Sequence, residues 1–191
     1  MHNSIVLASQ SPRRKQLLEW AEIPFEIIVK ETDEQYPDGL EVEQIPVFIA
    51  RNKALEVQKF FSAQIAGRPI LAADTVVVLN NEIIGKPTSV EHAIDTIGRL
   101  ANTKHEVITG VVILFKEKEY SFFNKTEVWF HPLTKEQIEF YVHKYKPFDK
   151  AGAYAIQEWI GVTGIKQING DFYNVMGLPI SRVVQQLALL K

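Results

Sequence analysis

Three basic residues follow a serine and a proline near the start of the chain, in the stretch SPRRK that begins at Ser11. Serine followed by proline is a typical helix start, so Arg13, Arg14 and Lys15 fall in the first turn of a helix. The positive end of the helix dipole disfavours each cation there by about 0.3–1 kcal/mol. A bound phosphate would turn this penalty into a gain, because backbone N–H groups at a helix start also attract anions.

The same arginines allow a simpler interpretation. Arg13 and Arg14 could extend into solvent, or pair with Glu19 or Glu22 further along the helix, without any ligand. Spacing alone does not separate this interpretation from an anion site. The small side chain of Ser9, like that of the helix-starting serine, favours the anion site, because it lets the backbone approach a ligand.

Asp74 interrupts an apolar, β-branched run, PILAADTVVVL, which predicts a buried strand over residues 69–79. A carboxylate in such a strand needs a partner, a proton or a metal to offset its desolvation. Lys86 follows just beyond the return strand of the predicted hairpin, in IIGKP, so its ammonium group and the Asp74 carboxylate could face one cleft. The alternative is a structural aspartate that bonds to a neighbouring loop.

Two further polar features each allow a functional and a structural interpretation. Lys53 lies beside the apolar face of a helix predicted at about residues 44–62. It either contacts a ligand or extends its aliphatic stem along apolar surface with the charge in water. Glu31, Asp33 and Glu34 form an acidic loop, which is either a solvated turn or a source of ligands for magnesium.

Strands and helices alternate along the chain, which predicts an α/β fold with a mixed sheet. No repeat, low-complexity tract or Ser/Gly linker interrupts the alternation, so we expect one domain. Two helix starts show capping-box spacing, Thr88 with Glu91 and Thr134 with Gln137. The remaining expected elements are strands at 25–29, 106–115 and 120–130, helices at about 89–101 and 179–190, and a hairpin across the NGD that ends at residue 171.

Composition excludes several classes of protein. The 191 residues carry 21 basic and 23 acidic side chains, so the chain lacks the basic excess typical of non-specific nucleic-acid binding. It has no cysteine, which excludes thiol catalysis, disulfides and thiolate zinc sites, and its five histidines show no paired ligand spacing. Any metal would be held mainly by oxygen. Without a signal peptide or a long apolar run, we expect a cytoplasmic protein with no membrane partner.

Several motifs together resemble the Maf family of nucleoside triphosphate pyrophosphatases. They are LASQSPRR, IARNKA, AADTVV, GKP, DKAGAYAIQ and NGDFYNVMGLP, in the order and spacing of the family from about residue 5 to 187. The resemblance implies a two-lobed α/β fold over residues 1–191, related to the inosine triphosphate pyrophosphatases, with the active site in the cleft between the lobes. It also implies hydrolysis of a nucleoside triphosphate to the monophosphate and pyrophosphate with a divalent cation, Mg²⁺ or Mn²⁺.

The resemblance also implies roles for individual residues. The motifs SPRR and YAIQ resemble the branch that acts on dTTP and UTP, whereas the branch that acts on 7-methyl-GTP usually has tryptophan in place of Arg13. One departure is visible, since Glu158 and Trp159 follow Gln157 where the family pattern has glycine. The implied site comprises Asp74 as proton acceptor and, with Glu34, metal ligand; Ser9, Arg14, Lys53 and Lys86 around the phosphates, with Lys86 also catalytic; and Arg13, Thr75 and Gln157 as specificity residues.

Two alternative functions stay open at this point. Maf proteins are associated with septum formation, so the chain could act mainly by binding a component of the division machinery. It could also be a house-cleaning enzyme for inosine or xanthosine triphosphates, as in the related fold, and only Arg13 and Gln157 argue against this. A homodimer is a further expectation from the family, and the expected partner is the nucleoside triphosphate itself.

Overall fold

One mixed β-sheet organises the chain in the computed structural model, which describes residues 4–190. Within that range its seven strands are β1 (Ile5–Leu7), β2 (Phe25–Ile27), β3 (Ile70–Leu79), β4 (Glu82–Ile84), β5 (Lys104–Phe115), β6 (Lys118–Phe130) and β7 (Ile165–Asn169). They pair in the order β2-β1-β3-β5-β6-β7, and β4 pairs with β3 off this path. Strand β1 runs parallel to β2 and β3, whereas β4 and β7 are antiparallel to β3 and β6. The predicted α/β class with a mixed sheet is confirmed.

Helices occupy most of the connections between these strands. The α-helices are α1 (Pro12–Trp20), α2 (Ile45–Phe60), α3 (Ser62–Ile65), α4 (Val90–Leu100), α5 (Lys135–Tyr145), α6 (Trp159–Gly164), α7 (Phe172–Met176) and α8 (Ile180–Ala188), and the 3-10 turns are η1 (Val42–Gln44) and η2 (Ala151–Ala153). None of the helices in the described part of the chain is both long enough and apolar enough to cross a membrane.

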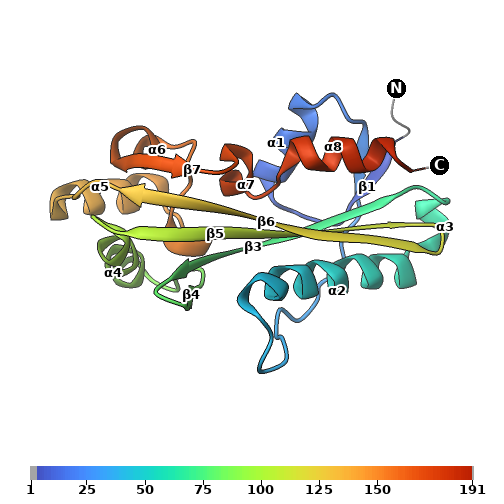
Figure 1. Ribbon diagram of the computed structural model, residues 1–191, viewed down its shortest axis with the longest axis horizontal. Coiled ribbons are helices and arrows are strands. Elements are labelled where there is room, and N and C mark those ends of the chain that lie inside the picture. Colours follow the sequence, from blue (N-terminus) through green and yellow to red (C-terminus); the bar gives the residue numbers. More distant parts are fainter. Residues whose placement is uncertain (1–3, 191) are drawn as a thin grey trace. The chain divides into compact units, whose positions relative to one another are not determined.

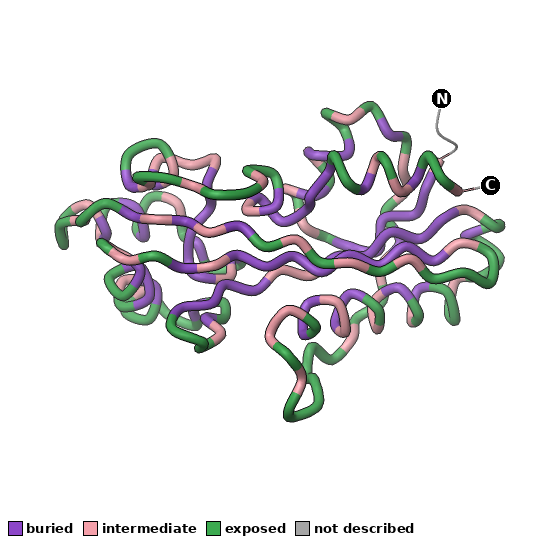
Figure 2. The backbone as a smooth tube through the Cα atoms, viewed as in Figure 1, coloured by how far each residue is buried: buried purple, intermediate pink, exposed green. Residues whose placement is uncertain are grey.

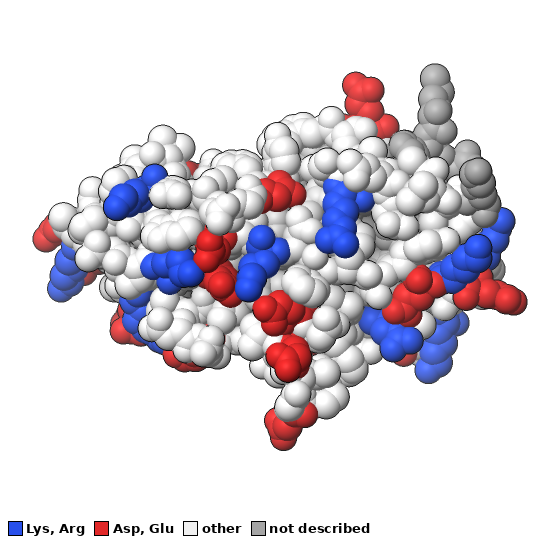
Figure 3. Space-filling view, viewed as in Figure 1, with Lys and Arg blue, Asp and Glu red and all other residues white. Residues whose placement is uncertain are grey.

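The chain divides into two compact units. The first consists of Met1–Asp74, Thr109–Asn124 and Gly177–Lys191, and the second of Thr75–Ile108 and Lys125–Met176. Strands β3, β5 and β6 each contribute residues to both units. On the face drawn in Figure 3, acidic and basic side chains are interspersed, as the nearly balanced composition leads one to expect.

In the first unit, helices cover both faces of the strands. Figure 1 shows α2 on one face and α8 on the other. The buried residues of α2 follow a helical period and form a stripe that faces the sheet, whereas its other side is exposed (Figure 2). Phe60, in the last turn of α2, is 54% exposed. The core-facing stripe therefore ends at Val57.

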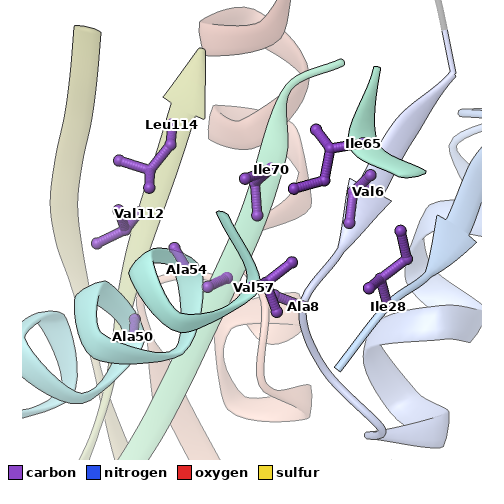
Figure 4. Close-up of a cluster of buried hydrophobic side chains, with 11 residues drawn as sticks. Val6, Ala8, Ile28, Ala50, Ala54, Val57, Ile65, Ile70, Val112 and Leu114 are labelled. Carbon is purple, nitrogen blue, oxygen red and sulfur yellow. The ribbon is translucent and has the colours of Figure 1, made fainter. Parts of the chain in front are cut away.

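Small residues bring α2 close to the sheet. Ala50 and Ala54 of α2 lie over a cluster that includes Ala8 at the end of β1, Ile70 of β3 and Val112 of β5 (Figure 4). At Gly110 of β5 the contact is closer still. A Cβ atom there would lie 2.2 Å from the backbone nitrogen of Val47, nearer than any atom can sit. The start of α2 thus rests directly on the β5 backbone, as only glycine allows.

Two predicted helix starts agree with the structure. Helix α1 begins at Pro12 with Ser11 as its N-cap residue, although the serine side chain makes no capping hydrogen bond. The capping box at the start of α5 is formed. Gln137 N–H donates to Thr134 Oγ1 at 3.3 Å, and Thr134 N–H donates to Gln137 Oε1 at 2.8 Å.

Two predicted local structures are wrong: a helix cap and a hairpin. Helix α4 is capped by Ser89, whose Oγ accepts from His92 N–H at 3.1 Å, so the predicted box of Thr88 with Glu91 is not the cap. The hairpin across NGD is absent from the described residues, because β7 pairs with β6 and the chain then enters α7. Asp171 helps to start that helix, since its Oδ1 accepts from Tyr173 N–H at 2.8 Å.

Candidate active site

Arg14 is buried and held at two points. Its Nε donates to the carbonyl oxygen of Gly177 at 2.8 Å, and its Nη1 donates to Ser9 Oγ at 3.1 Å. Ser9 Oγ also accepts from Ser11 N–H at 3.3 Å, so the loop after β1 is tied to the first turn of α1. The interpretation of Arg14 as a solvated surface arginine is therefore wrong. Lys15, which is exposed, is the residue that pairs with Glu19, at 3.7 Å.

Burial leaves the Arg14 cation poorly solvated. It lowers the pKa of Arg14 to about 10, against the opposing influence of the Asp74 and Glu34 carboxylates and with the help of the Arg13 charge. The side chain still carries its proton at neutral pH. A desolvated, oriented guanidinium group binds phosphate through short, charge-assisted hydrogen bonds. Arg13 is half-buried beside it on the same turn.

Lys53 links two carboxylates. Its Nζ lies 2.7 Å from Asp74 Oδ1 and 2.7 Å from Glu34 Oε1. The side chains of Lys53 and Asp74 are only 18% and 14% exposed, whereas that of Glu34 is 47% exposed. The desolvated carboxylate within the β3 strand thus has the partner that its position requires. Lys53 is not the surface lysine of the alternative interpretation.

The fold explains why these side chains meet. The paired residues Leu7 and Leu71 fix β1 parallel to β3, so the chain after β1 emerges beside the part of β3 that leads to Asp74. Ligands of α/β sheets commonly bind at the carboxyl ends of parallel strands. Helix α2 carries Lys53 on its sheet-facing side, between the buried Ala50 and Val57. The close approach of α2 then brings Lys53 Nζ to the Asp74 carboxylate.

The acidic residues of this cluster, Asp74 and Glu34, have the carboxylate oxygens that a divalent cation prefers. Within residues 4–190, no three His, Asp or Glu side chains gather into a group that could hold a metal alone. Asp74 and Glu34 both contact Lys53 Nζ. Mg²⁺ usually takes one or two carboxylates and completes its shell with water and substrate phosphate oxygens. Asp33 has a local role instead, because its Oδ1 accepts from Gln35 N–H at 3.0 Å.

The other three predicted site residues belong to the second unit. Thr75 follows Asp74 directly on β3 and is half-buried, and Lys86 is exposed in the loop after β4. That loop is tied to η2, because Gly152 N–H donates to the carbonyl oxygen of Gly85 at 3.2 Å. Gln157 follows η2 and is half-buried, and its Oε1 atom is buried without a hydrogen-bond partner among the described residues.

Sequence reasoning assigned no role to Gly177, whose carbonyl oxygen orients Arg14. The glycine lies within the motif NGDFYNVMGLP and adopts a φ of +112°, a backbone conformation that favours glycine. The motif could have drawn attention to this glycine. The contact could not be predicted, because any residue has a backbone carbonyl and this one lies 163 residues away from Arg14 in the sequence.

Comparison with known proteins identifies the family. A family model described as "Maf-like protein" matches residues 4–190. The chain belongs to the Maf-like protein family. The resemblance drawn from the sequence motifs is thereby confirmed.

This Maf-like protein has relatives that match it over almost its whole length. It is 51% identical over 188 residues to a dTTP/UTP pyrophosphatase of Cytophaga hutchinsonii, covering 98% of this chain and 84% of the relative. It is 44% identical to a dTTP/UTP pyrophosphatase of Parabacteroides distasonis, covering 96% of this chain and 94% of the relative. Among solved structures, the Staphylococcus aureus Ham1 protein matches with a TM-score of 0.45 and 15% identity, over 67% of this chain and 72% of that one.

Proposed function

We propose that this Maf-like protein hydrolyses dTTP and UTP to the nucleoside monophosphate and pyrophosphate, with a divalent cation. The observation that carries the proposal is the pairing of the largely buried Asp74 with Lys53, beside the buried and oriented Arg14. These groups are an acceptor for a proton and two cations for a polyphosphate. Relatives 44% and 51% identical to this chain are named dTTP/UTP pyrophosphatases, which supports the same substrates here.

Arg14, Lys53 and Lys86 hold the triphosphate in this proposal. Negative charge accumulates on the pyrophosphate as it leaves, and oriented cations that bind this charge are commonly the largest contribution to catalysis. Arg14 is preorganised, because the Gly177 carbonyl and the Ser9 hydroxyl fix its guanidinium plane before any substrate arrives. Ser9 also keeps the loop after β1 close to the phosphates.

Asp74 accepts the proton of the attacking water. The water oxygen forms a bond to the α-phosphorus, the bond from that phosphorus to the oxygen bridging the α- and β-phosphates breaks, and pyrophosphate leaves. General base catalysis of this kind contributes about 10²–10⁴-fold to the rate. Before the substrate binds, the Lys53 ammonium group holds the Asp74 carboxylate in place from a distance of 2.7 Å.

Asp74 and Glu34 are the residues that would hold Mg²⁺ or Mn²⁺. When bound, the ion neutralises charge on the triphosphate. The two carboxylates already share the charge of Lys53 Nζ, so a triphosphate that attracts Lys53 would free their oxygens for a metal.

The cytoplasmic location and the homodimer expected from the sequence stay predictions.

Arg13, Thr75 and Gln157 select the base in this proposal. Uracil and thymine present acceptors at O2 and O4 and a donor at N3, and an arginine with a glutamine amide can satisfy all three. Cytosine reverses the donor and acceptor at two of these positions. A site built on such hydrogen bonds rejects an analogue that leaves them unpaired far more strongly than one that differs by a methyl group.

A nucleotide panel tests the proposal. Purified protein with Mg²⁺ is given dTTP, UTP, CTP, ITP, XTP, GTP, ATP and 7-methyl-GTP, and the products are identified as pyrophosphate plus monophosphate. We expect kcat/KM for dTTP and UTP to be similar and well above the others. Equal turnover of ITP or XTP would favour the house-cleaning alternative. Absence of pyrophosphate release from every nucleotide would favour a protein that acts by binding.

A further inference from the structure

Gln157 lies in a tight turn that the protein must hold in place. Glu158 N–H donates to the carbonyl oxygen of Ala155 at 3.1 Å, so the glutamine occupies the middle of the turn. Its Oε1 atom is buried and lacks a hydrogen-bond partner among the described residues. A buried amide oxygen without a partner costs stability, because it has lost its hydrogen bonds to water. The turn sets the direction in which the Gln157 side chain leaves the backbone.

One hydroxyl group holds both ends of this turn. Tyr141, which is fully buried on α5, accepts a hydrogen bond from Ala155 N–H at 3.2 Å. The same hydroxyl donates to the Oε2 atom of Glu158. A tyrosine oxygen has one proton to donate and can also accept, so both bonds are formed at once. The ring is fixed by stacking on Tyr145, with centroids 5.0 Å apart.

Glu158, at the far end of the turn, is held by two side chains. Besides the Tyr141 hydroxyl, its carboxylate faces the Lys150 ammonium group at 3.6 Å, and Lys150 is buried. The residue that departs from the family pattern thus points into the protein. Behind it, a Cβ atom at Gly161 would lie 1.7 Å from the Ile156 carbonyl oxygen, so the first turn of α6 rests directly on the turn.

We propose that the Tyr141 hydroxyl is a positioning group for base selection, because it fixes the Gln157 amide by holding Ala155 and Glu158 at the two ends of one turn. This inference rests on the proposed function, in which Gln157 reads the base. Hydrogen bonds to a base edge depend on the orientation of the amide, whereas the bond-breaking step takes place at the phosphates. Loss of the hydroxyl should therefore change discrimination between bases more than it changes turnover.

Tyr141→Phe tests the inference, with Tyr145→Phe as the matched control, because it removes a hydroxyl from the ring stacked on Tyr141. The quantity measured is the ratio of kcat/KM for UTP to that for CTP, with Mg²⁺. In Tyr141→Phe we expect this ratio to fall by about three- to tenfold. A loss of this size corresponds to the net contribution of one hydrogen bond between Gln157 and the base. The kcat for saturating UTP should stay within about twofold of wild type, and the control should keep the wild-type ratio.

A double-mutant cycle shows whether Tyr141 acts through Gln157. Gln157→Ala should lower the same ratio, and adding Tyr141→Phe to it should cause no further loss. If Tyr141→Phe fails to fold, Glu158→Gln takes its place in both measurements. It can still accept from the Tyr141 hydroxyl but lacks the charge that faces Lys150, so we expect a smaller loss of the ratio in the same direction.

Each contrary result has a distinct meaning. A wild-type ratio near one overturns both the base preference of the proposed function and the inference. A high wild-type ratio that Gln157→Ala leaves unchanged overturns the role of Gln157, and the inference with it. A ratio that falls in Gln157→Ala but not in Tyr141→Phe overturns the positioning role alone. An equal loss of kcat for UTP and CTP in Tyr141→Phe, with the ratio intact, also overturns it.

Discussion

The Lys53 ammonium nitrogen lies 2.7 Å from Asp74 Oδ1, with both side chains largely buried. The pair joins helix α2 to strand β3, and Glu34 closes it on the exposed side at 2.7 Å from the same nitrogen. Breaking a buried pair by removing one charge is costly, since the other charge stays buried. Substitutions at this cluster must therefore keep the shape of the side chain if they are to report on chemistry.

Asp74→Asn is expected to remove nearly all turnover. The amide keeps the shape of the side chain and can still contact Lys53, but it cannot accept a proton from water. Loss of a general base costs about 10²–10⁴-fold in kcat. Steady-state kinetics with UTP would measure the loss, and equilibrium binding of UTP should persist.

Asp95→Asn is the matched control, because Asp95 is exposed on α4. It should leave kcat unchanged. If Asp74→Asn kept kcat within about tenfold of wild type, Asp74 would not be the general base.

Arg14→Lys is expected to lower kcat/KM for dTTP and UTP by about 10- to 100-fold, the worth of charge-assisted hydrogen bonds. Lysine keeps the charge but cannot reach the Gly177 carbonyl and Ser9 Oγ in the geometry of the guanidinium group. Arg14→Ala should lower it further, since the charge is also lost. Lys15→Ala, at the exposed neighbour, serves as control. An unchanged kcat/KM in Arg14→Ala would mean that Arg14 only supports the fold.

Glu34→Gln is expected to weaken the apparent affinity for Mg²⁺ by at least about tenfold, within the range seen when groups around a metal are removed. At saturating Mg²⁺ the kcat should be largely restored, because Asp74 is intact. The measurement is the Mg²⁺ dependence of the rate with UTP. Glu31→Gln, in the same exposed loop, should leave that dependence unchanged. Equal effects of the two substitutions would argue that the loop acts only through its general negative charge.

Gly110→Ala is expected to destabilise the protein. Its Cβ atom would lie 2.2 Å from Val47 N, so α2 must shift away from β5. Overpacking of this kind costs about 1–3 kcal/mol. Gly98→Ala, where a Cβ atom meets nothing within 4 Å in α4, should instead stabilise by about 0.4–1 kcal/mol. Urea unfolding compares the two. A Gly110→Ala protein as stable as wild type would show that α2 does not rest firmly on β5.

Local patterns in the sequence predicted much of the fold, since their causes lie within a few residues. The start of α1 at Pro12 and the capping box of Thr134 with Gln137 are examples. The cap of α4 was misplaced by one residue, because Thr88 and Ser89 are both good caps and only the tertiary path of the chain selects one. The NGD hairpin was wrong for a related reason. Strand β7 finds its partner in β6, which is distant in sequence.

The sequence predicted which residues form the candidate site, but not which of them contact one another. Asp74 stood out as a charge in an apolar strand, and the structure gives it the partner that such a position demands. No local pattern showed that this partner would be Lys53, 21 residues earlier. The buried Arg14 likewise donates to the carbonyl oxygen of Gly177, which only the folded chain brings near. Sequence thus indicated which groups are anomalous, and tertiary packing decides what satisfies them.

A buried histidine makes stability depend on pH. His105 is 1% exposed, with its Nε2 atom 2.7 Å from the Tyr154 hydroxyl and its ring against Phe130. Burial lowers the pKa of His105 to about 3 and raises that of Tyr154. In the unfolded chain the histidine has its ordinary pKa, near 6.5. Between these values the unfolded chain binds a proton that the folded protein excludes, so acid favours unfolding.

The sign and size of the effect follow from this proton. The free energy of unfolding should be fully retained above about pH 6.5 and fall by about 1.4 kcal/mol per pH unit below it, or about 2 kcal/mol from pH 7 to pH 5. In His105→Gln, the free energy of unfolding measured in urea should fall by about 2 kcal/mol less between pH 7 and pH 5 than in wild type, because glutamine does not titrate. His131→Gln, at an exposed histidine, should lose as much as wild type between the two pH values. If His105→Gln lost as much as wild type, another group would cause the acid sensitivity, and His105 would not be excluded from protonation in the folded protein.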